Sequence, residues 1–228
     1  MSAGPAAQEG RSRSRPRGEG FAVTAPRLAL AALLACAALL AGCGSLFGPP
    51  PPAPHFWTLD PALPAAASPA AAAAAPVVIV ATPRAAAGFD TDRIVYVREA
   101  HRLEPYADNQ WIETPPRMLG PLIAEALSRS GAFAAVLATP SPANGRWELD
   151  TQIVALQHEV AEQRVRFALR ATLVDKPTRT VVAAREFEAT APAQTANPAG
   201  AVAAANAAVA DVLKQLTDFC VAGVAARR

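Results

Sequence analysis

The stretch RVRFALRATLV, residues 164–174, decides the fold because two kinds of side chain alternate along it. Successive residues of a β-strand point to opposite faces, so every second position shares a face. One face carries Val165, Phe167, Leu169, Ala171 and Leu173, and the other carries Arg164, Arg166 and Arg170. The pattern predicts a strand with one face on the core and the other in water.

Two flanking stretches predict a three-stranded meander around this strand. WELDTQIVALQHEV (147–160) precedes it across a tight connection at residues 162–163. TVVAAREFEA (180–189) follows it after the proline-containing turn DKPT (175–178). Because short connections join antiparallel strands, we expect the three stretches to pair antiparallel in chain order.

Proline and glycine mark the limits of one longer helix. Thr114-Pro115 fits an N-cap and a first helical position, and the apolar spacing that follows ends at Gly131. Pro121 lies inside this stretch and lacks an amide donor. We therefore expect a kink at Pro121, or a helix that starts near Gly120.

A second longer helix is expected at the C-terminal end. Asn197-Pro198 fits its cap, and an apolar stripe repeats at helical spacing up to Cys220. Gly223 stands where the next apolar contact would be due, so the helix is expected to fray or end near it. Cys220 lies on this stripe and is expected to be a small core residue rather than a reactive thiol.

Further apolar runs predict strands at 77–81, 93–97 and 133–137. The element order predicts an α+β domain, with the two longer helices on one face of a mainly antiparallel sheet.

The N-terminal region predicts lipidation at Cys43. A basic stretch, RSRSRPR (11–17), precedes an uncharged run at 28–40 that is shorter than the roughly 20 residues of a membrane-spanning helix. This is the anatomy of a secretory signal peptide. Residues 40–43, LAGC, match the lipobox of bacterial lipoproteins, in which a peptidase cuts before an acylated cysteine. We expect residues 1–42 to be a signal peptide and acylated Cys43 to hold the protein in a membrane; the alternative is an ordinary signal sequence that contains a cysteine.

Loss of this leader changes the charge of the chain. The whole sequence has 21 Lys and Arg, 19 Asp and Glu, and a net charge of +2. The leader carries five of the arginines and two of the glutamates, which leaves 16 basic and 17 acidic residues and a net charge of −1. Because no basic excess remains, we expect no nucleic acid partner.

Residues 43–76 are rich in proline and alanine and are expected to form a disordered, lipidated linker. Proline runs favour an extended polyproline II helix, so residues 44–53 would span roughly 30 Å. HFWTLDP (55–61) interrupts this linker with two aromatic residues and a leucine. We expect it to dock as a strand on the sheet edge or core of a single domain that spans residues 77–228.

An ordered set of short motifs behind the lipobox resembles the ABC-type transport auxiliary lipoproteins, the PqiC-like family. The resemblance rests on FWTLDP (56–61), Pro83, FDTDRIVYV (89–97), Tyr106, Trp111, Pro115 and EALSRSGAF (125–133). It implies a non-enzymatic lipoprotein that accompanies ABC-type machinery moving lipids across the bacterial cell envelope. It also implies a periplasmic MCE-domain protein as the partner, and no cofactor. In bacterial lipoproteins Asp after the cysteine favours inner-membrane retention, so Gly44 favours the outer membrane.

Four residues are predicted to contact such a partner. Tyr106 and Trp111 lie in YADNQW, a stretch expected to be a polar loop, and aromatic side chains are frequent in binding hot spots. Arg93 precedes a strand, and Arg166 lies on the arginine face of the central strand. Each also has a purely structural interpretation: core packing for the aromatic residues, a surface ion pair for Arg93, and cross-strand pairing with glutamates for Arg166.

The sequence contains no enzyme motif that we recognise. It lacks G-x-S-x-G, H-E-x-x-H and a glycine-rich phosphate loop. His55, His101 and His158 lack metal-ligand spacing. We therefore expect neither catalytic nor metal-binding residues. The alternative function is that of an outer-membrane assembly lipoprotein or a small-ligand-binding lipoprotein of similar fold.

We predict that Cys43→Ser abolishes lipidation, because serine offers no thiol to accept the diacylglyceryl group. Cells grown with labelled palmitate should label the wild type and the control Cys36→Ser, but not Cys43→Ser. Each buried methylene contributes about 0.8 kcal/mol to membrane binding, so the variant should also leave the membrane fraction. Label in the Cys43→Ser protein would contradict the lipobox interpretation.

Overall fold

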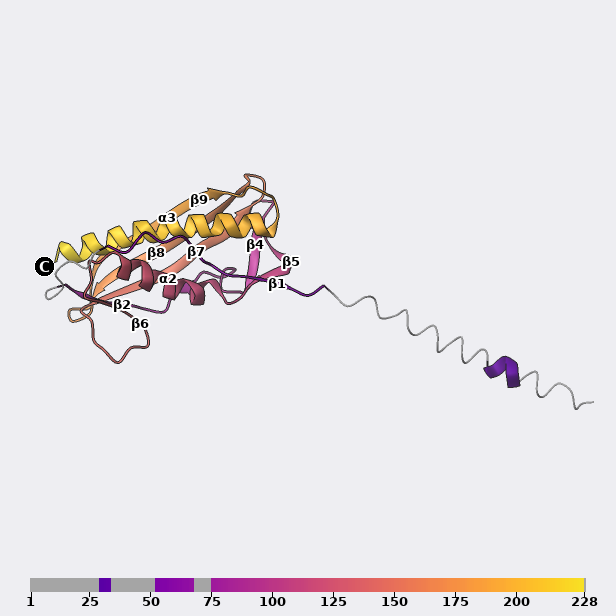
Figure 1. Ribbon diagram of the computed structural model, residues 1–228, viewed down its shortest axis with the longest axis horizontal. Helices are drawn as coiled ribbons and strands as arrows, with labels where there is room; N and C mark the ends of the chain where they lie inside the picture. Colours follow the sequence, from indigo (N-terminus) through magenta and orange to yellow (C-terminus); the bar gives the residue numbers. More distant parts are fainter. Residues whose placement is uncertain (1–28, 34–51, 68–74, 228) are drawn as a thin grey trace, which may run out of the picture. The chain divides into compact units, whose positions relative to one another are not determined.

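The computed structural model describes residues 29–33, 52–67 and 75–227 (Figure 1). Residues 29–33 are helical, whereas Cys43 and the rest of the expected leader lie outside the described residues. Lipidation therefore stays a prediction. Among the described residues, no helix combines the length and apolar character needed to cross a membrane.

The predicted meander forms the largest part of the sheet (Figure 1). It consists of β7 (Trp147–Glu159), β8 (Arg164–Asp175) and β9 (Thr180–Pro192). β8 pairs antiparallel with β7 on one side and with β9 on the other, along its whole length. The central strand and both of its predicted neighbours are thus confirmed.

Shorter strands share the other edge of β7. β2 (Val77–Val80), β3 (Arg84–Ala85) and β4 (Arg93–Val97) pair in parallel with successive stretches of β7. β6 (Ala135–Ala138) pairs in parallel with β2 and extends the sheet. The sheet therefore has nine strands, with antiparallel long pairings and mostly parallel short ones. The α+β class and the three short strands are confirmed.

Two helices cover one face of this sheet (Figure 1). α3 (Pro198–Ala225) packs on β7, β8 and β9, while α2 (Pro115–Arg129) packs on β2, β3 and β6 and touches α3. The face of β8 beneath them is completely buried. Burial of five apolar side chains on this one strand, at about 1.5–3 kcal/mol for each large one, is a main source of the core's stability.

The two helices compare differently with the sequence-based expectations. α2 begins at Pro115 and continues through Pro121, so the later start near Gly120 is wrong. Packing on the sheet holds the helix despite the missing amide donor. α3 ends at Ala225, two residues after Gly223, as expected. A Cβ atom at Gly223 would lie only 2.8 Å from Leu173 Cδ2, so this glycine also allows close approach of the helix to β8.

The stretch expected to be a polar loop is strand β5 (Leu103–Trp111). It pairs antiparallel with β4 on one side and in parallel with β1 (His55–Trp57) on the other. Its burial alternates, with half-buried Glu104 and Tyr106 between exposed neighbours. The loop expectation was wrong because pairing along both edges outweighs the weak strand propensity of Asp and Asn.

Residues 52–67 belong to the folded unit, which begins at Pro52 rather than at residue 77. The docking of 55–61 is confirmed, since β1 lies at the sheet edge and Leu59 is only 6% exposed. The chain then follows the helices: the Asp60 amide donates to Asn206 Oδ1 at 2.7 Å, and the Ala67 amide to the Arg129 carbonyl at 2.8 Å. The expectation of a disordered linker does not hold for this segment.

We predict that Leu59→Ala lowers the free energy of unfolding by about 2–5 kcal/mol, because it deletes a buried side chain. The matched control is Phe56→Ala on the same docked segment. Phe56 is 57% exposed, so its replacement should change the free energy by no more than about 0.5 kcal/mol. Urea titration measures both. Equal losses in the two variants would contradict the docking of Leu59.

Candidate functional site

Trp111, predicted to contact a partner, is part of the core. Its side chain is 3% exposed and lies opposite Trp57 in the pairing of β5 with β1. Its amide donates to the Asp92 carbonyl at 2.7 Å. This burial removes Trp111 from any contact surface, in agreement with its structural interpretation.

Tyr106 is half-buried and bonded to a histidine that the sequence analysis did not single out as functional. The Tyr106 hydroxyl lies 2.7 Å from Nδ1 of His158, which is 1% exposed on β7. Burial lowers the pKa of His158 and raises the pKa of Tyr106 to about 12, so both groups are neutral near pH 7. Which of the two groups donates depends on whether Nδ1 or Nε2 of the neutral imidazole carries the proton. Nε2 of His158 has no partner among the described residues.

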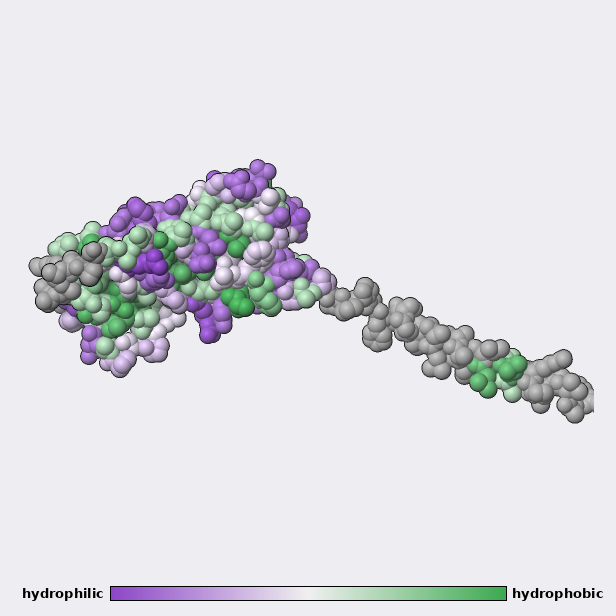
Figure 2. All heavy atoms as spheres, in the orientation of Figure 1, coloured by the Kyte–Doolittle hydropathy of each residue, from purple (hydrophilic) through white to green (hydrophobic). Residues whose placement is uncertain are grey.

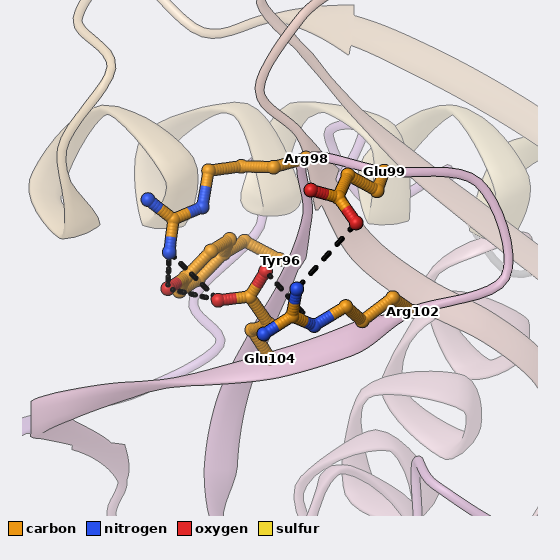
Figure 3. Close-up of polar contacts among 5 residues, drawn as sticks. All are labelled: Tyr96, Arg98, Glu99, Arg102 and Glu104. Carbon is orange, nitrogen blue, oxygen red and sulfur yellow. Dashed lines mark hydrogen bonds and ion pairs between the residues drawn. The ribbon is translucent and has the colours of Figure 1, made fainter.

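A network of charged residues continues from this pair to the surface (Figure 3). The rings of Tyr106 and Tyr96 lie 4.6 Å apart between centroids. The Tyr96 hydroxyl donates to Glu104 at 3.1 Å, and Arg98 donates to Glu104 at 2.7 Å. The hydrogen bond from Arg98 lowers the pKa of Glu104 and raises that of Arg98. These compensated charges tie β4 to β5 at the surface.

This network is not arranged for catalysis. A general acid or base must come within hydrogen-bonding reach of a substrate. His158 is almost completely inaccessible, and it does not line the hollow formed by Phe89, Val97, His101, Arg102, Leu103 and Gln157. Glu104 is held by Arg98 and Tyr96. Within the ranges that the structure describes, no three His, Cys, Asp or Glu side chains form a group suited to a metal ion.

The two predicted arginine contacts lie in different surroundings. Arg166 donates to Glu188 on β9 at 2.7 Å, which raises its pKa and confirms the cross-strand interpretation. Arg170 makes the same kind of contact with Glu186 at 2.8 Å. Arg93 is exposed at the start of β4 and forms no ion pair with any other described residue. Arg93 lies opposite Gln110, the neighbour of Trp111 in β5, whereas Arg166 lies on a separate strand.

An apolar groove of about 540 Å³ lies between α2, α3 and residues 64–67. Alanine, leucine and valine side chains form most of its wall. Its charged residues are paired within their own helices, Arg129 with Glu125 at 2.6 Å and Lys214 with Asp218 at 3.7 Å. On the face shown in Figure 2, hydrophobic areas are small and interrupted by hydrophilic ones. Neither the apolar groove nor these hydrophobic areas present an arrangement of reactive side chains.

His158 was not identified as a notable residue, although the sequence holds one signal for it. Along β7, inward positions are otherwise occupied by apolar residues and one threonine, Thr151, and His158 stands among them. A polar residue at an inward position requires a hydrogen-bond partner.

Cys220 lies where expected: it is fully buried in α3, and burial raises its pKa to about 12.

Comparison with known proteins identifies a family. The family model described as "ABC-type transport auxiliary lipoprotein component" matches residues 57–217. No curated protein matches the chain.

Solved structures share the fold. Protein XCC0632 from Xanthomonas campestris aligns with a TM-score of 0.67 at 23% identity, covering 76% of this chain and 98% of its own. An uncharacterized protein aligns with a TM-score of 0.57 at 11% identity, covering 76% of this chain and 99% of its own.

We predict that the protein loses stability as the pH falls below about 6.5. The folded state holds His158 neutral, whereas the unfolded chain binds a proton near the ordinary pKa of histidine, so protonation favours unfolding. Urea titrations between neutral pH and about pH 5 measure this slope. In His158→Gln, whose amide can still accept the Tyr106 hydrogen bond but does not titrate, the slope should be flatter. Identical slopes would show that His158 is not responsible.

Proposed function

The chain belongs to the family of ABC-type transport auxiliary lipoprotein components, and we propose that it is a non-enzymatic, membrane-anchored accessory lipoprotein of an MCE- and ABC-type lipid transport system in the bacterial cell envelope. The family match carries this proposal, because residues 57–217 run from the end of β1 across the whole sheet and into the last turns of α3. The compensated charges of the described surface are consistent with a binding role.

Acylated Cys43 anchors the protein, and Gly44 favours the outer membrane with the domain facing the periplasm. Since the folded unit begins at Pro52, only eight residues, 44–51, separate its start from the anchor. At about 3.1 Å per residue, a spacer of this length reaches roughly 25 Å. The tether holds the domain close to the membrane, where a periplasmic transport component can be reached.

The proposed partner is the MCE-domain protein of the same system. Both helices cover one face of the sheet, so the opposite face of β8 and β9 offers an open, polar surface. Arg166 lies on this surface, and its side chain is 30% exposed beside Glu188. An arginine that is partly desolvated and already oriented is a favourable binding hot spot, because little side-chain freedom is lost on association.

We predict that the chain from Cys43 onward, with its lipid omitted by Cys43→Ser, binds the MCE-domain protein of the proposed transport system. Arg166→Ala should weaken binding by at least about 2 kcal/mol, or roughly 30-fold in Kd. Arg170→Ala is the matched control, because it removes an equivalent ion pair on the same strand face. Calorimetric titration measures binding, and thermal melting checks folding.

Two results would count against this proposal. A folded protein that does not associate at micromolar concentration would contradict the transport role. Equal losses from Arg166→Ala and Arg170→Ala would show that general charge, not the predicted contact, determines binding. Trp111→Ala should lose binding only because the domain unfolds, since it deletes a core side chain at a cost of about 3–5 kcal/mol.

A further inference from the structure

Two large apolar side chains are exposed together at one corner of the sheet. Phe56 on β1 and Ile112 just after β5 are each 57% exposed. The Ile112 amide donates to the Trp57 carbonyl at 2.7 Å, so Ile112 continues the line of β5 beside β1. An exposed apolar pair held on a rigid sheet edge indicates a contact surface.

Strand register places an arginine in the same row. Phe56 lies opposite Gln110 on β5, and Gln110 lies opposite Arg93 on β4. Residues opposite one another in a sheet share a face, and Ile112, two positions beyond Gln110, shares it as well. Trp57 and Trp111 therefore point the other way, toward the core. We call Phe56, Ile112 and Arg93 the corner patch.

Charges next to the corner patch leave Arg93 available for an anion. Arg93 has no ion-pair partner in the part of the chain that the structure describes, and the exposed Asp90 and Asp92 just before it are not paired with it. Glu113, which follows Ile112, is paired with Arg117 at 3.2 Å. Asp108 is half-buried two residues before Gln110. The corner patch thus combines apolar side chains with an unpaired cation, the combination that suits the surface of an anionic bilayer.

The length of chain before the corner patch limits how far it can lie from the anchor. Phe56 is 13 residues after Cys43, and a fully extended chain spans at most about 3.3–3.6 Å per residue. Phe56 is therefore within roughly 45 Å of the lipid-bearing residue in any conformation. β1 is also the first strand of the folded unit, so Phe56 follows the tether closely along the chain.

We propose that the corner patch contacts the lipid surface of the membrane to which Cys43 is anchored. The inference rests on the anchoring in the proposed function. Acyl chains alone tether the domain without orienting it, whereas insertion of Phe56 and Ile112 beside Arg93 fixes one corner of the sheet on the bilayer. The opposite edge, β9, then points away from the membrane and is presented to partners.

Single-cysteine labelling tests this contact. Cys220 is fully buried with its pKa raised to about 12, and Cys43 is acylated, so an introduced exposed thiol is labelled selectively. Phe56→Cys and Ile112→Cys place an NBD fluorophore in the corner patch. The matched control is Val181→Cys, which is 54% exposed on β9 at the other edge of the sheet. The lipidated protein is reconstituted in vesicles of phosphatidylethanolamine and phosphatidylglycerol.

The label at position 56 or 112 should shift its emission to shorter wavelength and be quenched by nitroxide lipids, whereas the label at 181 should do neither. Adding Phe56→Ala to Ile112→Cys should reduce the shift, and Arg93→Ala should reduce it in anionic vesicles more than in phosphatidylcholine vesicles. Thermal melting of each labelled protein confirms that it is folded.

Flotation with the vesicles separates failure of this proposal from failure of the anchor. If the protein floats but labels at 56 and 112 behave like the label at 181, the lipid contact is wrong and the anchoring stands. If the wild-type protein is not lipidated and does not float, both are wrong. A shift that appears only after the MCE-domain protein is added would overturn the lipid contact and assign the corner patch to a protein.

Discussion

Pairing of β8 with β7 on one side and β9 on the other satisfies its backbone from Arg164 to Asp175. With both edges occupied, only the two faces of this strand remain for packing. The apolar face needs a cover, and α3 supplies it, approaching closely enough at Gly223 that a Cβ atom there would lie only 2.8 Å from Leu173 Cδ2. The arginine face stays in water, balanced by glutamates on the neighbouring strands. The length of β7 then leaves room on its far edge for β2, β3 and β4.

The sequence was sufficient to identify a strand or helix wherever one face of that element had to be apolar. The alternation at 164–174 identified the central strand, and helical spacing identified α2 and α3. It failed where structure depends on distant pairing: β5 is polar, and only β4 and β1 on its two sides make it a strand. Composition also suggested a linker for residues 52–67, because two buried side chains, Leu59 and Pro61, are a weak signal among alanines and prolines.

For the candidate site, the sequence identified residues that make specific contacts, but it did not show whether those contacts are with a partner or within the protein. Tyr106, Trp111 and Arg166 all make specific contacts, but these contacts are mainly within the protein. Local patterns could not show this, because a tryptophan in a polar stretch looks exposed until its strand is paired. Arg93 is the exception, since it has no ion-pair partner among the described residues. Most charged side chains on these strands are paired within the protein, whereas Thr151 Oγ1, His158 Nε2 and Asp175 Oδ1 are buried without a hydrogen-bond partner among the described residues.

The docking of residues 52–67 also has a mechanical consequence. A pull on the N-terminal side of the domain first reaches β1, which is bonded only to β5. Behind it, the bonds from Asp60 to Asn206 and from Ala67 to Arg129 fasten the chain to both helices. Tension along the tether therefore acts first on the pairing of β1 with β5 and on the hydrogen bonds of Asp60 and Ala67. In the sheet, β7 is three strand positions away from β1, and β9, the far strand of the meander, is five positions away. The meander therefore does not lie in the direct path of that force.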